Sequence, residues 1–579
     1  MDLNGHTLTV QGDLIQMDGI MNINGGNLIV EGGYYLGNPD TMWDENDGAT
    51  STGYLFMTKP EDYVRVEGDF YISWGKPYNY TDYYYSTSSL LTDGVLEVKG
   101  NFVQKEKVEP YASVKKCSFP ASGNHRLILS GEEGQTVWFA NSSLEGSRIA
   151  GLKITNNSAA GVTFKGEPCV TGEVDTERGQ NINGYLSVSS TDQLKGNYFA
   201  GGIVNSAIME VKEDVEIGGN FKVLHYGGSS TAADVKVKDA HLSVGGSLLI
   251  EGILAMDNSR VEVQGDTCIV SENRYCAFGI RMQNENDHLL INGDFMKETA
   301  DSQFSFGTLE VKGDYRDKGE QIYGTDHRVI LSGTGLQTVD CTSTFGTLEL
   351  QNYSAAGVYS EKTIRKNKLI LNGCRLTIGD GSGIYGFTLT EDYIAAGDFT
   401  LLDDTLDLNG HTLTIQGDLI LQDGWVNVNG GRLVVEGNLL MENEEDSVAI
   451  KGNLIIDAKE DITGDLTKGS IELSGDLQQT GDNAFAFGGA MTLMGQKKQS
   501  IYSEMPIMLY DLAILKSKIL TCNQKQFSGR RFLYGKRTDR GMCGGFEQES
   551  NRQRQRSFAG YRPVKGRMLW GKCYPGRKL

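Results

Sequence analysis

Aromatic side chains are concentrated in one stretch of the sequence, YISWGKPYNYTDYYY (71–85). Aromatic rings pack against the C–H faces of sugars, and Tyr and Trp also carry a hydrogen-bonding group at the ring edge. The stretch therefore predicts a glycan-binding surface, with the alternative that the rings pack a long loop onto the body of the protein. The candidate ligand-binding residues are Trp74, Tyr78, Tyr80, Tyr83, Tyr84 and Tyr85.

Carboxylates form local clusters at 44–47, 403–404 and 442–446. Grouped carboxylates act as general acid and base in polysaccharide-cleaving enzymes, and their oxygens bind calcium. Residues 44–48 resemble the start of a calcium-binding loop, but Leu55 stands where that loop needs its bidentate glutamate. We expect solvated loops here. No catalytic residue, metal site or cofactor is predicted, beyond weak calcium binding by turn residues.

The strands and turns that must position these side chains are predicted by a short sequence motif that recurs through residues 1–520. The motif begins with two apolar residues, each followed by one residue of another type. A Gly comes next, then Asp or Asn, and then a further apolar residue. Examples are LTVQGDL (8–14), LEVKGDY (309–315) and LTIQGDL (413–419). Alternation with a period of two is typical of a half-buried strand. The Gly–Asp pair predicts a turn in which Gly adopts a positive φ and Asp bonds the turn backbone.

Three longer cassettes contain this motif, and the shorter spacings between equivalent apolar positions cluster near twenty residues. A strand–turn–strand unit at this spacing, with no helical pattern between units, predicts an all-β parallel β-helix or β-solenoid with loop insertions. Tandem β-sandwich modules are the alternative. The anchors that we align are Leu8, Leu28, Val64, Leu96 and Gln135; Leu242, Val261, Leu289, Leu309 and Gln337; and Leu413, Leu433, Val448, Ile471 and Gln499.

The phrase LDLNGHTLTIQGDLI (406–420) and the Gly–Asp turns resemble bacterial cell-surface repeat proteins. Those proteins belong to the right-handed parallel β-helix group, which also contains pectin-lyase-like and adhesin folds. The resemblance covers about residues 1–520. It implies an exported, extracellular or surface-displayed protein that contacts glycans or other cell-surface polymers. It brings no catalytic motif.

Both ends of the chain depart from the family pattern. Met1 aligns with Leu406 inside a repeat, so we expect a fragment whose signal peptide and cap lie upstream. An uncapped first repeat would favour end-to-end self-association. Residues 521–579 hold 15 Lys+Arg and 3 Asp+Glu, a net charge of +12, and lack the repeat. We interpret them as a disordered basic tail or the product of a shifted reading frame; a basic arm for nucleic acid or another anionic polymer is the alternative.

The whole chain holds 54 Lys+Arg and 75 Asp+Glu, a net charge of −21, so residues 1–520 carry −33. An acidic body of this kind disfavours direct nucleic-acid binding. No apolar run approaches the ~18 residues that indicate a transmembrane helix. The predicted organisation is cassette one (1–164), connecting repeats with cassette two (165–359), connecting repeats with cassette three (360–520) and the basic tail (521–579).

The sequence thus predicts a non-enzymatic structural or adhesive β-solenoid. One alternative is a polysaccharide lyase or hydrolase on the same fold, because fold alone does not decide function. Another is a passive component of a surface layer or extracellular matrix.

Overall fold

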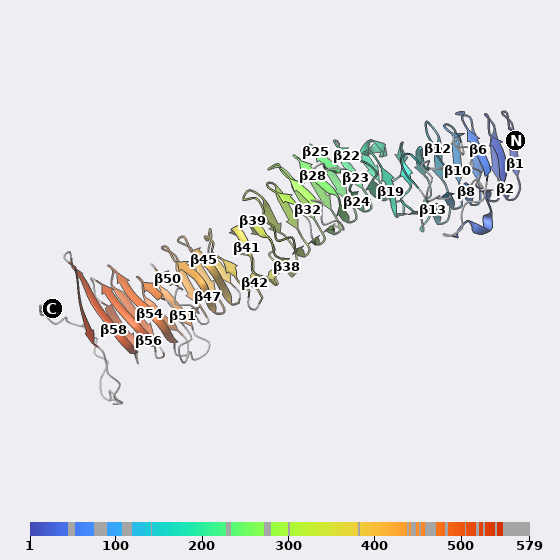
Figure 1. Ribbon diagram of the computed structural model, residues 1–579. Coiled ribbons are helices and arrows are strands. Elements are labelled where there is room, and N and C mark those ends of the chain that lie inside the picture. The colour runs from blue at the N-terminus through green and yellow to red at the C-terminus, as the bar shows by residue number, and fades with distance from the viewer. Residues whose placement is uncertain are drawn as a thin grey trace, which may run out of the picture. The chain divides into compact units, whose positions relative to one another are not determined.

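The computed structural model is built from β-strands and a few short 3-10 helices within the residues it describes (Figure 1). These residues are 1–44, 52–74, 90–106, 118–140, 142–226, 233–270, 279–298, 302–379, 382–395, 397–436, 439–441, 447–450, 453–457, 470–480, 485–503, 505, 507–516, 520–524, 527–538 and 541–547. The chain divides into two compact units, Met1–Glu349 and Leu350–Leu579. The 3-10 helices are η1 (Pro39–Thr41), η2 (Thr191–Gln193) and η3 (Lys195–Asn197).

The first part of unit 1 winds through three parallel sheets in a fixed order, and we call each turn of this coil a rung. Sheet 1 contains β1 (Thr7–Val10), β4 (Asn27–Val30), β7 (Tyr63–Val66), β10 (Val95–Val98), β12 (Arg126–Leu129), β14 (Gly151–Ile154) and β17 (Val174–Asp175). Sheet 2 contains β2 (Leu14–Ile15), β5 (Tyr34–Leu36), β8 (Phe70–Trp74), β11 (Phe102–Glu106), β13 (Gln135–Phe139), β15 (Val162–Lys165) and β18 (Ile182–Asn183). Sheet 3 contains β3 (Asp18–Asn22), β6 (Thr52–Met57) and β9 (Leu90–Leu91).

The later part of unit 1 repeats this order in a second set of sheets. Sheet 4 contains β20 (Tyr198–Phe199), β23 (Val215–Ile217), β26 (His241–Val244), β29 (Arg260–Val263), β32 (His288–Ile291), β35 (Thr308–Val311), β37 (Arg328–Leu331) and β39 (Thr344–Leu350). Sheet 5 contains β16 (Cys169–Val170), β19 (Tyr185–Val188), β21 (Gly202–Asn205), β24 (Phe221–Leu224), β27 (Leu248–Glu251), β30 (Thr267–Ile269), β33 (Phe295–Lys297), β36 (Tyr315–Asp317) and β38 (Gln337–Cys341). Sheet 6 contains β22 (Met209–Val211), β25 (Val235–Lys238), β28 (Ile253–Asp257), β31 (Gly279–Met282) and β34 (Gln303–Phe304).

Parallel pairing confirms the predicted solenoid and excludes antiparallel sandwich modules for these rungs. Leu8, Leu28, Val64 and Leu96 stand opposite one another in successive strands of sheet 1, as their spacing predicts. Leu242, Val261, Leu289 and Leu309 form the same kind of column in sheet 4. Apart from the half-buried Leu8 in the first strand, the side chains of both columns are buried, so the core of each rung continues into the next.

Unit 2 is also made of parallel strands, with one antiparallel pair at its end. Strands β40 (Val358–Ser360) and β42 (Leu376–Ile378) pair with each other, and β41 (Arg365–Ile370) lies between them in sequence. Sheet 7 contains β44 (Tyr393–Ala395), β46 (Thr412–Ile415), β48 (Arg432–Val435), β51 (Leu454–Asp457), β53 (Leu477–Thr480), β55 (Gln499–Ser503) and β57 (Leu520–Gln524). Sheet 8 contains β43 (Ile384–Tyr385), β45 (Phe399–Asp407), β47 (Leu419–Asn427), β49 (Leu439–Met441), β50 (Ser447–Ile450), β52 (Ser470–Leu473), β54 (Phe485–Gly495), β56 (Ile507–Lys516), β58 (Phe527–Thr538) and β59 (Gly541–Glu547).

Two anchors of the third cassette, Val448 and Ile471, do not continue the column of Leu413 and Leu433, because they pair with each other in sheet 8. The alignment predicts that Val448 stacks on Leu433, but Leu433 pairs with Leu454 in sheet 7 and Val448 pairs with Val426 in sheet 8. Only 15 residues separate Leu433 from Val448, too few for a full turn when the neighbouring rung from Leu413 to Leu433 takes 20. The repeated motif therefore lies on a different face of the coil there.

The glycine of the Gly–Asp turn has a different role from the predicted one. Gly12, Gly68 and Gly100 do not adopt a positive φ; in this region Asn4 and Gly5 of the Asn–Gly turns do. The Gly–Asp glycines instead stack directly on one another, because a Cβ on Gly100 would lie 2.4 Å from the backbone of Gly68. Glycine is needed at these turns to let successive backbones approach closely.

The residue after this glycine links one rung to the next through its side chain. The prediction that it bonds its own turn is wrong, since the acceptor oxygen meets the backbone N–H of the next rung. The bonds run from the N–H of Ser247 to Asn220, of Asp294 to Asp266, of Asp314 to Asp294 and of Thr338 to Asp314, at 2.7–2.8 Å. Short acceptor side chains at this position therefore stitch the turns together.

The Gln shared by the three cassettes holds the turn of the preceding rung. Gln135 Nε2 donates to the carbonyl oxygens of Val98 at 3.0 Å and Gly100 at 2.7 Å, and its Oε1 accepts from Gly131 N–H. Gln337 makes the equivalent bonds in cassette two, and Gln499 bonds Leu473 and Gly475 in cassette three. All three Gln side chains are buried. Their repetition satisfies buried backbone groups, which are costly to leave unpaired.

The backbone of the basic segment begins with strands. β57 pairs with β55, β58 pairs with β56, and β59 returns antiparallel to β58. These strands end at Glu547, and residues 548–579 lie outside the described residues.

Candidate ligand-binding surface

The outward face of sheet 2 carries an apolar column where polar residues are expected on a solvated sheet. Tyr35 stands opposite Tyr71, Tyr71 opposite Val103, and Val103 opposite Trp138 in successive parallel strands. Their neighbours Tyr34, Phe70, Phe102 and Val137 point into the core. Because alternate residues face opposite sides of a strand, the aromatic column lies outside the coil.

A short segment after β5 covers the middle of this column. Met42, at the end of η1, packs with Tyr71 and Val103, and all three are buried. Asn38 accepts from Asp40 N–H at 3.1 Å and caps η1. The segment thus forms a small second core outside sheet 2, and we call residues 38–44 the covering segment.

Lys105 holds the covering segment against the sheet. Its Nζ donates to the carbonyl oxygens of Thr41 at 2.7 Å and of Asp44, and it lies 5.1 Å from the centre of the Trp138 ring. The lysine is buried, so its ammonium group replaces lost water contacts with carbonyl oxygens and an aromatic face. This contact fixes the segment that carries Trp43.

Two tryptophans meet where the covering segment crosses the column. The rings of Trp43 and Trp138 are stacked, with centroids 6.3 Å apart and an interplanar angle of 9°. Trp43 is 47% exposed and Trp138 is half-buried. An exposed indole stacked on a half-buried neighbour offers a rigid apolar face to a ligand, with little side-chain entropy left to lose on binding.

Polar groups border this aromatic surface. Tyr35 is half-buried, and burial, together with the nearby carboxylates of Asp13 and Asp69, raises the pKa of its hydroxyl. Asp13 Oδ1 accepts from Gly33 N–H at 2.7 Å and Asp69 Oδ1 from Asn101 N–H at 2.7 Å. The arrangement therefore combines an aromatic face with fixed acceptors, which is the combination that recognises polyhydroxylated ligands.

The predicted site residues are only partly placed. Trp74 ends β8, where its backbone stands opposite Glu106, and its side chain lies outside the described residues. Tyr78, Tyr80, Tyr83, Tyr84 and Tyr85 lie outside them as well. Tyr71, from the same aromatic stretch, is buried under Met42. The role predicted for these residues in ligand binding stays a prediction.

Sequence reasoning missed Trp43 and Trp138, although a signal for Trp138 was present. It occupies the third position after the repeated Gln, where cassette two has Asp340 and cassette three has Tyr502. A position that changes chemistry while its neighbours repeat is outward-facing and free of the core's constraint. Trp43 carries no such signal, because the covering segment has no counterpart in the other cassettes.

The carboxylate clusters give no site in the described part of the chain. Residues 45–47 and 442–446 lie outside it, as do the side chains of Asp403 and Asp404. Among the described residues, no group of three or more His, Cys, Asp or Glu side chains is arranged to hold a metal ion.

Comparisons with known proteins give no family for this chain: no family model matches it, and no curated protein matches its sequence. In the part of the chain that the structure describes, no helix is long and apolar enough to span a membrane.

Proposed function

We propose that this chain is a non-enzymatic, adhesive and structural β-solenoid, part of a larger exported bacterial surface protein. It binds glycans through the aromatic surface of Trp43, Trp138 and Tyr35, and Trp74 and Tyr78 are the further ligand-binding residues that the sequence predicts. The observation that carries the proposal is the exposed Trp43 ring stacked on Trp138 outside sheet 2. A buried lysine holds that ring in place, which core packing alone does not require.

The repeat supports the structural part of the proposal. Each rung is joined to the next by strand pairing, stacked glycines and side-chain bonds, so a surface feature on one rung keeps a fixed position relative to its neighbours. The acidic body adds charge that favours solubility and mutual repulsion. Together these features suit the display of a binding surface outside the cell.

A glycan array probed with the purified chain tests the binding function. We expect selective binding that is lost in Trp43→Ala and in Trp138→Ala, and weakened in Trp74→Ala and Tyr78→Ala. Trp425→Ala is the matched control, because Trp425 is also exposed but belongs to unit 2. Calorimetric titration with the best-bound oligosaccharide then measures the change in Kd.

Three outcomes would contradict the proposal. Binding unaffected by Trp43→Ala and Trp138→Ala would remove the aromatic surface from the mechanism. New reducing ends or unsaturated sugars, lost on carboxylate substitution, would identify an enzyme. Concentration-dependent filaments without glycan binding would favour a passive matrix component. Surface display is tested separately by protease treatment of intact source cells, which should cleave the protein without lysis.

A further inference from the structure

A lysine and an aspartate are buried face to face inside unit 1. Lys297 ends β33 and Asp317 ends β36, and the two residues stand opposite each other in the parallel register of sheet 5. Lys297 Nζ lies 3.0 Å from Asp317 Oδ1, and both side chains are 0% exposed. Removing two opposite charges from water costs more free energy than an ordinary pair regains, so this pair has no simple stabilising purpose.

The carboxylate of Asp317 is held by donors on both of its oxygens. The Tyr323 hydroxyl donates to Oδ2, and the Gly319 N–H donates to Oδ1 at 2.8 Å. The hydroxyl oxygens of Tyr315 and Tyr323 are 3.0 Å apart and share a hydrogen bond. Burial raises the pKa of Tyr323 well above its usual range, so the hydroxyl keeps its proton.

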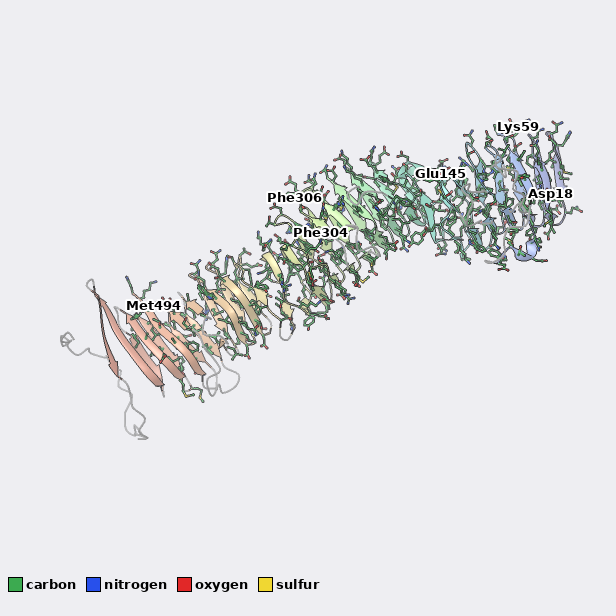
Figure 2. All side chains as sticks on the ribbon, in the orientation of Figure 1. Asp18, Lys59, Glu145, Phe304, Phe306 and Met494 are labelled. Atoms are coloured by element: carbon green, nitrogen blue, oxygen red, sulfur yellow. The ribbon has the colours of Figure 1, made fainter. Side chains whose placement is uncertain are left out.

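Aromatic rings enclose the pair. Phe304, labelled in Figure 2, packs against Tyr323 with ring centroids 4.8 Å apart, and Phe345 lies 5.4 Å from Tyr315. Lys297 Nζ lies 5.5 Å from the Tyr323 ring. The rings thus shield the amine and the carboxyl group from water, which would otherwise separate them.

The backbone leaves room for the amine. A Cβ on Gly319 would lie 2.4 Å from Lys297 Nζ and 3.0 Å from Asp317 Oδ1. The φ of Gly319 is not in the left-handed region. Glycine at this position therefore provides space for the neighbouring groups and is not required by the backbone conformation. Glycine at 319 therefore permits the contact between the two functional groups.

We propose that Lys297 and Asp317 form an intramolecular isopeptide bond that joins two neighbouring rungs covalently. In the first step one proton moves from the Lys297 ammonium to the Asp317 carboxylate. This leaves a neutral lysine amine, which is a nucleophile. Nζ attacks Cγ of the protonated carboxyl group, and the Tyr323 hydroxyl stabilises the negative charge that develops on Oδ2. This proposal does not depend on the proposed function.

The reaction balances without an added reagent. The Nζ–Cγ bond forms and the Cγ–Oδ1 bond breaks. Oδ1 leaves as water with two protons that the ammonium originally carried, while the third stays on the amide nitrogen. No electron is gained or lost, so neither an oxidant nor a reductant is needed.

Mass spectrometry of the purified chain after denaturation and trypsin digestion tests the bond. We expect a branched product in which peptide 282–312, uncleaved after Lys297, carries dipeptide 317–318 and lacks one water. The same product should be absent from Lys297→Met and Asp317→Ala. Recovery of peptide 282–297 with a free Lys297 and no branched product, from folded wild-type protein, would overturn the proposal.

Two milder variants separate chemistry from burial. Tyr323→Phe keeps the ring but removes the donor to Oδ2, so cross-linking should slow at least tenfold in folded protein. Gly319→Ala should also suppress it by displacing Nζ, whereas Gly335→Ala is the matched control because its Cβ would meet no atom within 4 Å. Full and equally fast cross-linking in Tyr323→Phe would overturn the role given to Tyr323.

Discussion

Sheet 2 and sheet 5 of unit 1 follow the same path and carry opposite chemistry. In sheet 2 the outward column is aromatic, with Tyr35, Tyr71 and Trp138. In sheet 5 the outward column passes through Met296 and Arg316, opposite each other in adjacent strands. The two regions therefore have the same backbone arrangement and differ in the side chains on their outer face.

The inward columns differ as well. In sheet 2 the polar inward residue is Gln104, whose amide donates to Ser118 Oγ at 2.8 Å. In sheet 5 the same inward position at the end of the strand holds Lys297 and Asp317. Since glycines and turn residues fix the rungs, the strand positions between them accept new chemistry without changing the fold. In a repeat of this kind, the residues that fix the fold are different from the residues whose side chains can vary.

Removing one partner of the inward pair gives the largest expected effect. Asp317→Ala leaves Lys297 buried without its carboxylate and should destabilise these rungs by about 3–5 kcal/mol. Hydrogen exchange of the β33 and β36 amides measures it. The control Lys318→Ala breaks an exposed pair with Glu298, whose atoms lie 2.9 Å apart, and should cost less than about 1 kcal/mol. Equal effects would show that burial of the pair has no energetic consequence.

Acid should weaken both parts of unit 1 through an equivalent buried histidine in each. Burial lowers the pKa of His125, which directly precedes β12 of sheet 1, and of His327, which directly precedes β37 of sheet 4, to about 4. The unfolded chain binds a proton at a pKa near 6.5, so stability should fall as the pH drops from about 6.5 to 4. The loss approaches about 3 kcal/mol per histidine.

Substitution of one histidine localises this effect. Neither ring nitrogen of His125 has a hydrogen-bond partner within the described residues, so His125→Leu should remove its share of the acid sensitivity. Urea unfolding at pH 7 and pH 4 gives the comparison. His6→Leu, at an exposed position, is the control for the substitution itself. A parallel loss in wild type and His125→Leu would assign the acid sensitivity to other groups.

The glycine column should be less sensitive than the buried pair. Gly100→Ala forces a Cβ against the Gly68 backbone and should cost about 1–3 kcal/mol by overpacking. Gly12→Ala tests the same residue type in the same turn, where a Cβ would meet no atom within 4 Å. Thermal unfolding of the two variants should differ. Equal melting temperatures would mean that the turns separate easily.

The outward aromatic column should have the smallest effect on stability. Trp43→Ala removes a half-exposed ring and one stacking contact, so the free energy of unfolding should fall by less than about 1.5 kcal/mol. Glycan binding should be lost in the same variant. Urea unfolding and array binding, measured on one preparation, separate the two effects. A large loss of stability would show that Trp43 is a structural residue.

The fold was predictable from the sequence because the same apolar alternation and turn residues recur in successive rungs. The spacing of Leu8, Leu28 and Val64 alone predicted that they stand in one column. The prediction failed at Val448, where the spacing is too short for a full turn of the coil. The candidate site was less predictable. Trp43 and Trp138 are 95 positions apart in sequence, and no local pattern states that a covering segment brings them together.

The sequence by itself determined the strands, the turns and the order in which rungs stack, because alternation and glycine spacing act over a few residues. The tertiary structure decided which residues meet across rungs. It made the glycines that were expected to adopt a positive φ points of close backbone contact, and it placed Lys297 against Asp317. Such contacts depend on register between strands that are distant in sequence, and register is fixed only when neighbouring rungs bury a common core.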